Sequence, residues 1–271
     1  MLEAEALHTA ARRYCIERFH YWTTRYSEIV SRGADRQRAG GNYTPEALEI
    51  FPRYNIIRAI QTETERLNPL SLCDLDTMRV WLINAGESAE DGFTGMPLGE
   101  IAQRSTLEER LRFRRYIGRL SSPELDSIEP LPYRRVLTGD ESKAIWSRFA
   151  ARWNISESFW YPLAGSQPRD VVAFESHPFR EAEVPERMRD ILHIHGIERL
   201  WEMTECDLDY ELDLSLFQPR YKASEGYWSS GDLDWIVYVS HESTVTIGGW
   251  LLDELKTMWP SWQAHEWNPS T

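Results

Sequence analysis

The chain has 271 residues, of which 42% are hydrophobic and 27% charged, and its formal net charge is −13. These proportions are typical of a globular protein and exclude wholesale disorder. The strong negative charge argues against binding to a nucleic-acid backbone or to anionic lipid, so we expect neither a nucleic-acid partner nor a membrane partner.

The first half of the chain is predicted to be helical. Apolar residues recur at every third or fourth position from Leu7 to Ile29, which places them on one side of a long helix. Thr44 and Pro45 supply a capping hydroxyl and a helix-starting proline, and Pro52 is expected to interrupt or kink the helix that they open. Four helices are expected, over about residues 7–32, 45–67, 72–84 and 100–120.

The last of these helices carries a dense set of arginines. Such a set is compatible with a phosphate-binding patch, but apolar residues alternate with the arginines and form a separate face. We interpret the arginines as the solvated side of a helix, paired with nearby acids such as Glu108 and Glu109. They are Arg110, Arg112, Arg114, Arg115 and Arg119.

Prolines at positions 123, 130 and 132 predict an extended connector, so we expect a helical domain over 1–137 and an acidic, tryptophan-rich domain over 138–271. Thr138 and Glu141 match a capping box that opens another helix. Residues 146–271 carry 21 acids and 10 bases, a net charge of −11, and ten of the twelve tryptophans.

Beyond residue 155 the apolar period changes from that of a helix to that of a strand. Strands that follow one another closely predict mostly antiparallel pairing, with helices covering the sheet. The fold class expected is therefore α+β, helical in the N-terminal half and sheet-containing in the C-terminal half. Strands are expected over 158–163, 171–174, 199–203, 210–217, 234–240 and 244–247, and helices from Pro185 to His195 and from Trp250 to Trp259.

The most specific feature is the stretch Glu205–Leu216, in which acidic and apolar residues alternate. In one extended strand, the five acids would share a face at intervals of about 6.5–7 Å. That face is a solvated surface, a docking stripe for a basic protein, or a divalent-metal site. A straight strand spreads carboxylates too widely to chelate one ion without help from a loop.

Three further features are candidates for a functional role. His193 and His195 lie on different sides of a predicted helix and have no third ligand at zinc-site spacing, so a structural role is favoured. Residues 240–243 are interpreted as a hairpin turn rather than an acid–base unit; on a strand, His241 and Glu242 would point to opposite faces and could not easily meet. Trp228 begins an expected flexible loop, with an exposed aromatic rim suited to a partner contact.

The cysteines and the N-terminus predict a cytoplasmic protein. Cys15, Cys73 and Cys206 are too scattered for a disulfide framework or a zinc site, and we expect each to be a small buried group in a reducing compartment. Residues 1–5 lack the basic segment and apolar run of a secretory signal, and no apolar stretch is long enough to cross a bilayer.

Two segments, FWYPL (Phe159–Leu163) and Tyr227–Leu252, resemble the C-terminal parts of bacterial proteins, some of which are immunity proteins encoded beside toxins. The resemblance covers less than half of the chain and consists of aromatic and turn residues. It implies a bacterial origin and a binding role, and it transfers no site residue.

Together these features predict a non-enzymatic protein-binding module, an immunity or antitoxin-type protein that neutralises a basic partner. No catalytic residue, metal ligand or cofactor is predicted. The alternative is a metal-dependent hydrolase that uses the carboxylates of 205–213 with His241 nearby. The predicted partner-binding residues are Glu205, Asp207, Asp209, Glu211, Asp213, Trp228 and Asp232.

Overall fold

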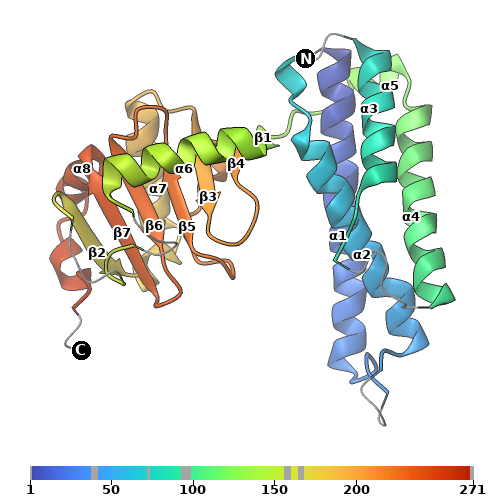
Figure 1. Ribbon diagram of the computed structural model, residues 1–271, viewed down its shortest axis with the longest axis horizontal. Helices are drawn as coiled ribbons and strands as arrows, with labels where there is room; N and C mark the ends of the chain where they lie inside the picture. Colours follow the sequence, from blue (N-terminus) through green and yellow to red (C-terminus); the bar gives the residue numbers. More distant parts are fainter. Residues whose placement is uncertain are drawn as a thin grey trace. The chain divides into compact units, whose positions relative to one another are not determined.

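The computed structural model confirms the α+β class (Figure 1). In the described residues it contains eight α-helices and one seven-stranded sheet, with antiparallel pairing throughout. The chain divides into two compact units, residues 1–131 and 132–271, which are described separately. The second unit begins six residues before the expected boundary, because residues 134–136 form a strand of its sheet. The structure describes all residues except 1, 38–41, 72–73, 93–98, 156–159, 164–167 and 269–271.

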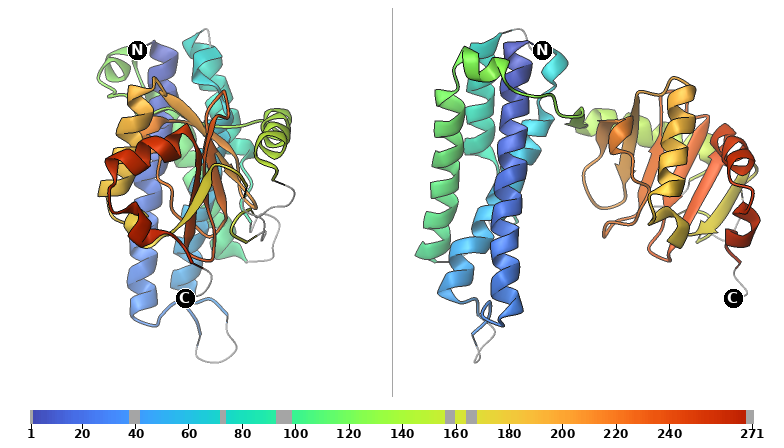
Figure 2. Two further views of the ribbon diagram at one scale, coloured as in Figure 1. Left: turned by 90° about the vertical axis from the view of Figure 1, so that its left-hand side faces the viewer. Right: turned by 180° about the vertical axis from the view of Figure 1, so that it is seen from behind.

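The first unit is a helical bundle whose helices lie close to the predicted ranges (Figures 1 and 2). One apolar cluster, which includes Leu7, Leu82 and Phe113, fills its centre. Thr44 caps the second helix as expected, since its hydroxyl accepts a hydrogen bond from the backbone N–H three residues later. The helices are α1 (Glu3–Ser31), α2 (Pro45–Arg66), α3 (Leu75–Ser88), α4 (Glu100–Arg119) and α5 (Ser122–Asp126), with a 3-10 turn at Pro69–Ser71.

Three details of this unit differ from the expectations. Helix α2 is not interrupted at Pro52 but continues through it, and Pro52 is buried together with Phe51. Helix α3 continues past Gly86, where a Cβ atom would lie 2.6 Å from the ring of Phe113, so glycine permits close packing of α3 on α4. The short helix α5 occupies part of the expected extended connector, because Pro123 suits a first helical turn and Ser121 caps it.

The second unit is built on a sheet with the strand order β1-β4-β3-β5-β6-β7-β2. Its strands are β1 (Arg134–Val136), β2 (Val171–Glu175), β3 (Arg199–Thr204), β4 (Tyr210–Asp213), β5 (Gly226–Ser229), β6 (Trp235–Val239) and β7 (Thr244–Gly249). The β6–β7 hairpin and the capping box at Thr138 and Glu141 are confirmed. The expected strand at 158–163 lies partly outside the described residues, and its remainder, from Trp160 to Leu163, contains a turn and no strand.

Three helices cover the two faces of this sheet (Figure 2). Helix α6 (Gly139–Trp153) packs on one face, while α7 (Glu183–Ile194) and α8 (Trp250–Met258) pack on the other. The central strand β6 therefore buries both sides: Tyr238 points into the α6 core and Val237 into the α7–α8 core. Short 3-10 helices lie at His177–Phe179, Leu214–Leu216 and Trp262–His265.

Candidate functional site

The acidic stretch 205–216 is not one strand, and this part of the sequence interpretation is wrong. Strand β3 ends at Thr204, residues 205–207 form a bend, β4 covers only Tyr210–Asp213, and a 3-10 turn follows. The backbone turns here because β3 and β4 pair with each other in antiparallel register. A continuous row of five carboxylates is therefore absent from this stretch, all of which the structure describes.

Two acids of β4 are paired within the chain. The carboxylate of Glu211 lies 3.0 Å from the guanidinium of Arg135 on β1 and accepts a hydrogen bond from the hydroxyl of Tyr133 at 3.2 Å. The carboxylate of Asp213 lies 3.6 Å from Arg199 and accepts the backbone N–H of Tyr133 at 2.5 Å. Both acids therefore connect neighbouring strands rather than facing a free surface.

Asp209 binds the start of α6. Its carboxylate accepts hydrogen bonds from the hydroxyl of Ser142, from the indole N–H of Trp146 at 3.2 Å and from the backbone N–H of Thr204 at 2.7 Å. These contacts fasten the helix to the β3–β4 turn. Asp209 is half-buried and serves the packing of this unit.

The other predicted contact residues do not form a common surface. Glu205 and Asp207 are exposed in the β3–β4 turn, next to the start of β5, whereas Asp232 is exposed in the turn that follows β5 at its opposite end. Trp228 is not in a flexible loop: it belongs to β5 and is buried against α7 and α8. Cys206, expected inside, is exposed, while Cys15 is buried as expected and Cys73 lies outside the described residues.

A buried carboxylate that the sequence analysis missed joins two turns at this end of the sheet. Glu225, only 2% exposed, lies just before β5. One of its oxygens is 2.5 Å from Nδ1 of His241 in the β6–β7 turn, and the other accepts the hydroxyl of Tyr238. Its backbone carbonyl accepts the N–H of Glu205 at 3.1 Å, so Glu225 connects the β3–β4 turn to the β6–β7 turn.

Residues 241–243 form the predicted hairpin turn between β6 and β7, and within this turn His241 and Glu242 meet. Nε2 of His241 lies 3.3 Å from the Glu242 carboxylate. The hydrogen bond with Glu225 raises the pKa of His241, and the negative charges of Glu225, Glu242 and Glu205 raise it further. We call Glu205, Glu225 and Glu242 the acidic cluster. Three different segments place these carboxylates around one imidazole.

The remaining pair of histidines lies at the C-terminal end of α7, where the sequence predicts the end of a helix. His193 lies in the last turn of α7, and His195 follows the helix, where its ring stacks on Trp250 with centroids 4.2 Å apart. His195 is exposed, and its Nε2 is 3.6 Å from Glu254. Within the described ranges, no group of three or more His, Cys, Asp or Glu side chains is arranged to hold a metal ion.

Arg110 and Arg114 of α4 are engaged within the helical unit, but their partners lie at the end of α3, and only Arg112 approaches one of the expected acids, at 3.9 Å from Glu109. Arg110 donates hydrogen bonds to the carbonyls of Gly86 and Glu87 at the end of α3, at 2.6 and 2.9 Å. Arg114 pairs with the carboxylate of Glu87 at 3.0 Å. These contacts stabilise the C-terminus of α3, where unpaired carbonyls accumulate.

Comparison of the chain with known protein families, with characterised proteins and with solved structures found no match. Among the helices in the described part of the chain, none is both long enough and apolar enough to cross a membrane.

Proposed function

We propose that the protein is a non-enzymatic protein-binding module of the immunity or antitoxin type, and that its second unit docks a basic protein at the acidic cluster. The observation that carries the proposal is the convergence of Glu205, Glu225 and Glu242 on His241. The bacterial origin and cytoplasmic location included in the proposal are supported by the sequence features alone.

The charge of the unit supports a cationic partner. Residues 132–271 contain 23 acids and 13 bases, a net charge of −10. Among the described residues, the exposed carboxylates of Glu205 and Asp207 form no ion pair with a basic side chain. The hydrogen bond to Glu225 and the nearby carboxylates raise the pKa of His241, the direction expected where a positive charge is favoured. A Lys or Arg side chain of a partner would gain from the same potential, and opposite charge would speed the encounter.

The proposed contact differs from the one that the sequence suggested. Asp209, Glu211 and Asp213 are occupied within the chain, and Trp228 is buried, so none of them is proposed as a contact now. Glu205 and Asp207 are retained, and Glu242 is added.

The test is affinity capture with the intact chain from an extract of the organism that encodes it. The variant Glu205→Gln/Asp207→Asn removes two charges of the β3–β4 turn, one of which, Glu205, acts on His241. The matched control Asp232→Asn/Asp234→Asn removes two charges at the opposite end of β5.

We expect wild type and control to capture the same basic protein, the first variant to lose it, and about 1 M salt, where the Debye length is about 3 Å, to release it. With the purified partner, the first variant should associate at least about ten-fold more slowly. Capture of no basic protein, or equal capture by all three chains, contradicts the proposal.

A further inference from the structure

Two histidines from distant parts of the chain meet at the edge of the sheet. Strand β2 is last in the sheet order, and the C-terminal segment lies beside it (Figure 1). His177 opens the 3-10 helix that follows β2, and His265 ends the 3-10 helix that follows α8. Their imidazole rings lie with centroids 5.1 Å apart and planes at 65°. We call these two residues the His177–His265 pair.

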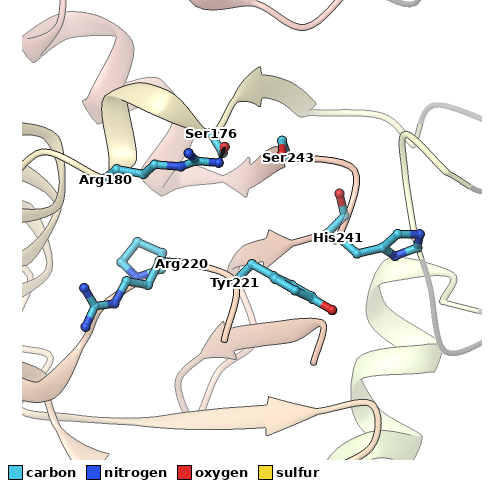
Figure 3. A pocket seen from close by; sticks show the side chains of 8 residues that line it. Ser176, Arg180, Arg220, Tyr221, His241 and Ser243 are labelled. Carbon is cyan, nitrogen blue, oxygen red and sulfur yellow. Dashed lines mark hydrogen bonds between the residues drawn. The ribbon is translucent and has the colours of Figure 1, made fainter. Parts of the chain in front are cut away.

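The backbone holds these two rings next to each other. Glu266, next to one histidine, forms an antiparallel bridge with Phe174 of β2. The N–H of Ser176, next to the other histidine, donates to the carbonyl of Ser243 at 2.8 Å, and Figure 3 shows the two serines side by side. Because both neighbouring positions are fixed, an entering ion would not need to order the segments that carry the rings.

Side chains orient the rings as well. The His265 ring stacks on Trp259, with centroids 5.1 Å apart and planes at 17°. Nδ1 of His177 lies 3.1 Å from the carboxylate of Glu175. A histidine that binds a metal ion through one ring nitrogen commonly has a carboxylate on the other, which sets the tautomer and raises the basicity of the ligand. Nε2 of His177 forms no hydrogen bond with another residue that the structure describes, and neither ring nitrogen of His265 does.

The separation of the rings fits one shared metal ion. A metal–nitrogen distance of about 2.0–2.1 Å puts each ring centroid about 3.2 Å from the ion, so two imidazoles at a tetrahedral angle have centroids about 5.2 Å apart. The His177–His265 pair stands at 5.1 Å. Imidazole suits Zn²⁺, Ni²⁺ and Cu²⁺, whereas Mg²⁺ prefers oxygen ligands. The 23 acids and 13 bases of residues 132–271 favour the approach of a cation.

We propose that the His177–His265 pair binds one divalent transition-metal ion of the class Zn²⁺, Ni²⁺ or Cu²⁺, and that the ion joins the C-terminal segment to the segment after β2. Two protein ligands are fewer than the three or four of ordinary zinc sites, so water completes the coordination and the ion is exchangeable. Glu175 is a positioning residue that orients His177. The site is separate from the acidic cluster, since Figure 3 shows the imidazole of His241 pointing away from Ser176.

The test is isothermal titration calorimetry on the intact chain, purified without a histidine tag, with Ni²⁺ and Zn²⁺ as probes and Mg²⁺ as the comparison ion. The variants are His177→Gln, His265→Gln and Glu175→Gln. The matched control is His193→Gln, which removes an exposed histidine of the same unit, and His241→Gln tests whether the acidic cluster binds the ion. The side chains of His177 and Glu175 are more than half exposed, so their variants retain the fold even where His265→Gln loosens the C-terminal segment.

We expect wild type, His193→Gln and His241→Gln to bind one Ni²⁺ or Zn²⁺ per chain and to show no binding of Mg²⁺ at the same concentration. Glu175→Gln should bind about ten-fold more weakly, and each variant of the His177–His265 pair more weakly still. Absence of binding by wild type at millimolar Ni²⁺, or binding that both variants of the pair retain, overturns the proposal. Loss of binding in His193→Gln or His241→Gln alone assigns the ion to that histidine and overturns it as well.

Discussion

The guanidinium of Arg135 lies 3.0 Å from the carboxylate of Glu211, and this contact ties strand β1 to strand β4. The same guanidinium donates two hydrogen bonds, at 2.8 and 2.9 Å, to Glu141, the capping residue of α6. One arginine therefore joins two strands and a helix start. This arrangement also explains why Glu211 is not available to a partner.

Replacing Arg135 with alanine should destabilise the second unit by about 2–3 kcal/mol, since it leaves two partly buried carboxylates without their cation. Urea unfolding followed by tryptophan fluorescence measures this, because ten of the twelve tryptophans lie after residue 145. Arg169→Ala, at an exposed position, should change the free energy of unfolding by less than about 0.5 kcal/mol. Equal effects of the two substitutions would show that the Arg135 contacts contribute nothing.

The same contact predicts an acid-range loss of stability. The hydrogen bonds from Arg135 lower the pKa of Glu141 from 4.5 to about 2. A carboxyl with a lower pKa in the folded state contributes its stability above the unfolded pKa, and loses it as the pH falls toward the folded pKa. The wild type should therefore lose stability from pH 4.5 toward 2, and Arg135→Ala should lose less over that range. Unfolding curves at a series of pH values check this.

Elements with a strong local period could be predicted from the sequence, and elements that depend on distant partners could not. The apolar stripe of α1 and the two runs of the β6–β7 hairpin are visible within the segments themselves. Strand β1 has only three residues and exists because it pairs with β4, far along the chain. Strand β5 contains Trp228 and ends within a Ser-Ser-Gly run that is typical of a loop, so the burial of Trp228 was not predicted.

The candidate site was only partly predictable for the same reason. Alternation from Glu205 to Asp213 correctly placed Glu211 and Asp213 on one face of β4, but alternation says nothing about Arg135, 76 positions away. Glu225 meets His241 across 16 positions and two turns, and no local pattern marks that contact. Pairing of side chains across the sheet depends on strand order, which the sequence alone did not supply.

The helical unit contains a fully buried acid, Glu109, whose carboxylate lies 2.6 Å from Arg18 and 3.2 Å from Arg53 and accepts the indole N–H of Trp22. Glu109→Gln should destabilise this unit by about 3 kcal/mol, because it leaves the largely buried Arg18 without its anion and removes one of the two carboxylates of Arg53, which keeps Glu108 at 2.7 Å. The neighbouring Glu108→Gln is the control: Glu108 is partly exposed, so its loss should cost about 1 kcal/mol or less. Urea unfolding followed by far-UV circular dichroism compares them, and a smaller effect at Glu109 than at Glu108 contradicts this account.

A buried histidine in α1 should make stability depend on pH above the range of the carboxylates. His8 is 2% exposed, its Nε2 lies 2.9 Å from the carbonyl of Thr64, and burial lowers its pKa from 6.5 to about 4. The unfolded chain takes up the proton first, so the stability present above pH 6.5 declines by about 3 kcal/mol as the pH falls to 4.

His8→Gln should remove most of this dependence of the unfolding free energy on pH, because the glutamine amide can still donate to the carbonyl of Thr64 and does not titrate. The matched control is His20→Gln, at an exposed position on the same helix, which should leave the slope unchanged. Unfolding free energies at several pH values between 4 and 7 provide the measurement. If the pH dependence of the unfolding free energy persists in His8→Gln, it comes from another titratable group.

The pairing of His241 with Glu225 predicts the behaviour of the acidic cluster itself. The hydrogen bond to Glu225 is the main cause of the raised pKa of His241, and the charges of Glu242 and Glu205 add to it. Because this pKa is higher in the folded state, the pair stabilises the fold below the unfolded histidine pKa and loses that contribution as the pH rises through the folded value.

Titration of the His241 ring proton by NMR should show a raised pKa in the wild type and a return toward the ordinary value in Glu225→Gln. Glu242→Gln, which removes an exposed neighbour, should lower the pKa less. Equal effects of the two substitutions would mean that surface charge in general raises the pKa of His241, and that the buried carboxylate of Glu225 has no special part in it.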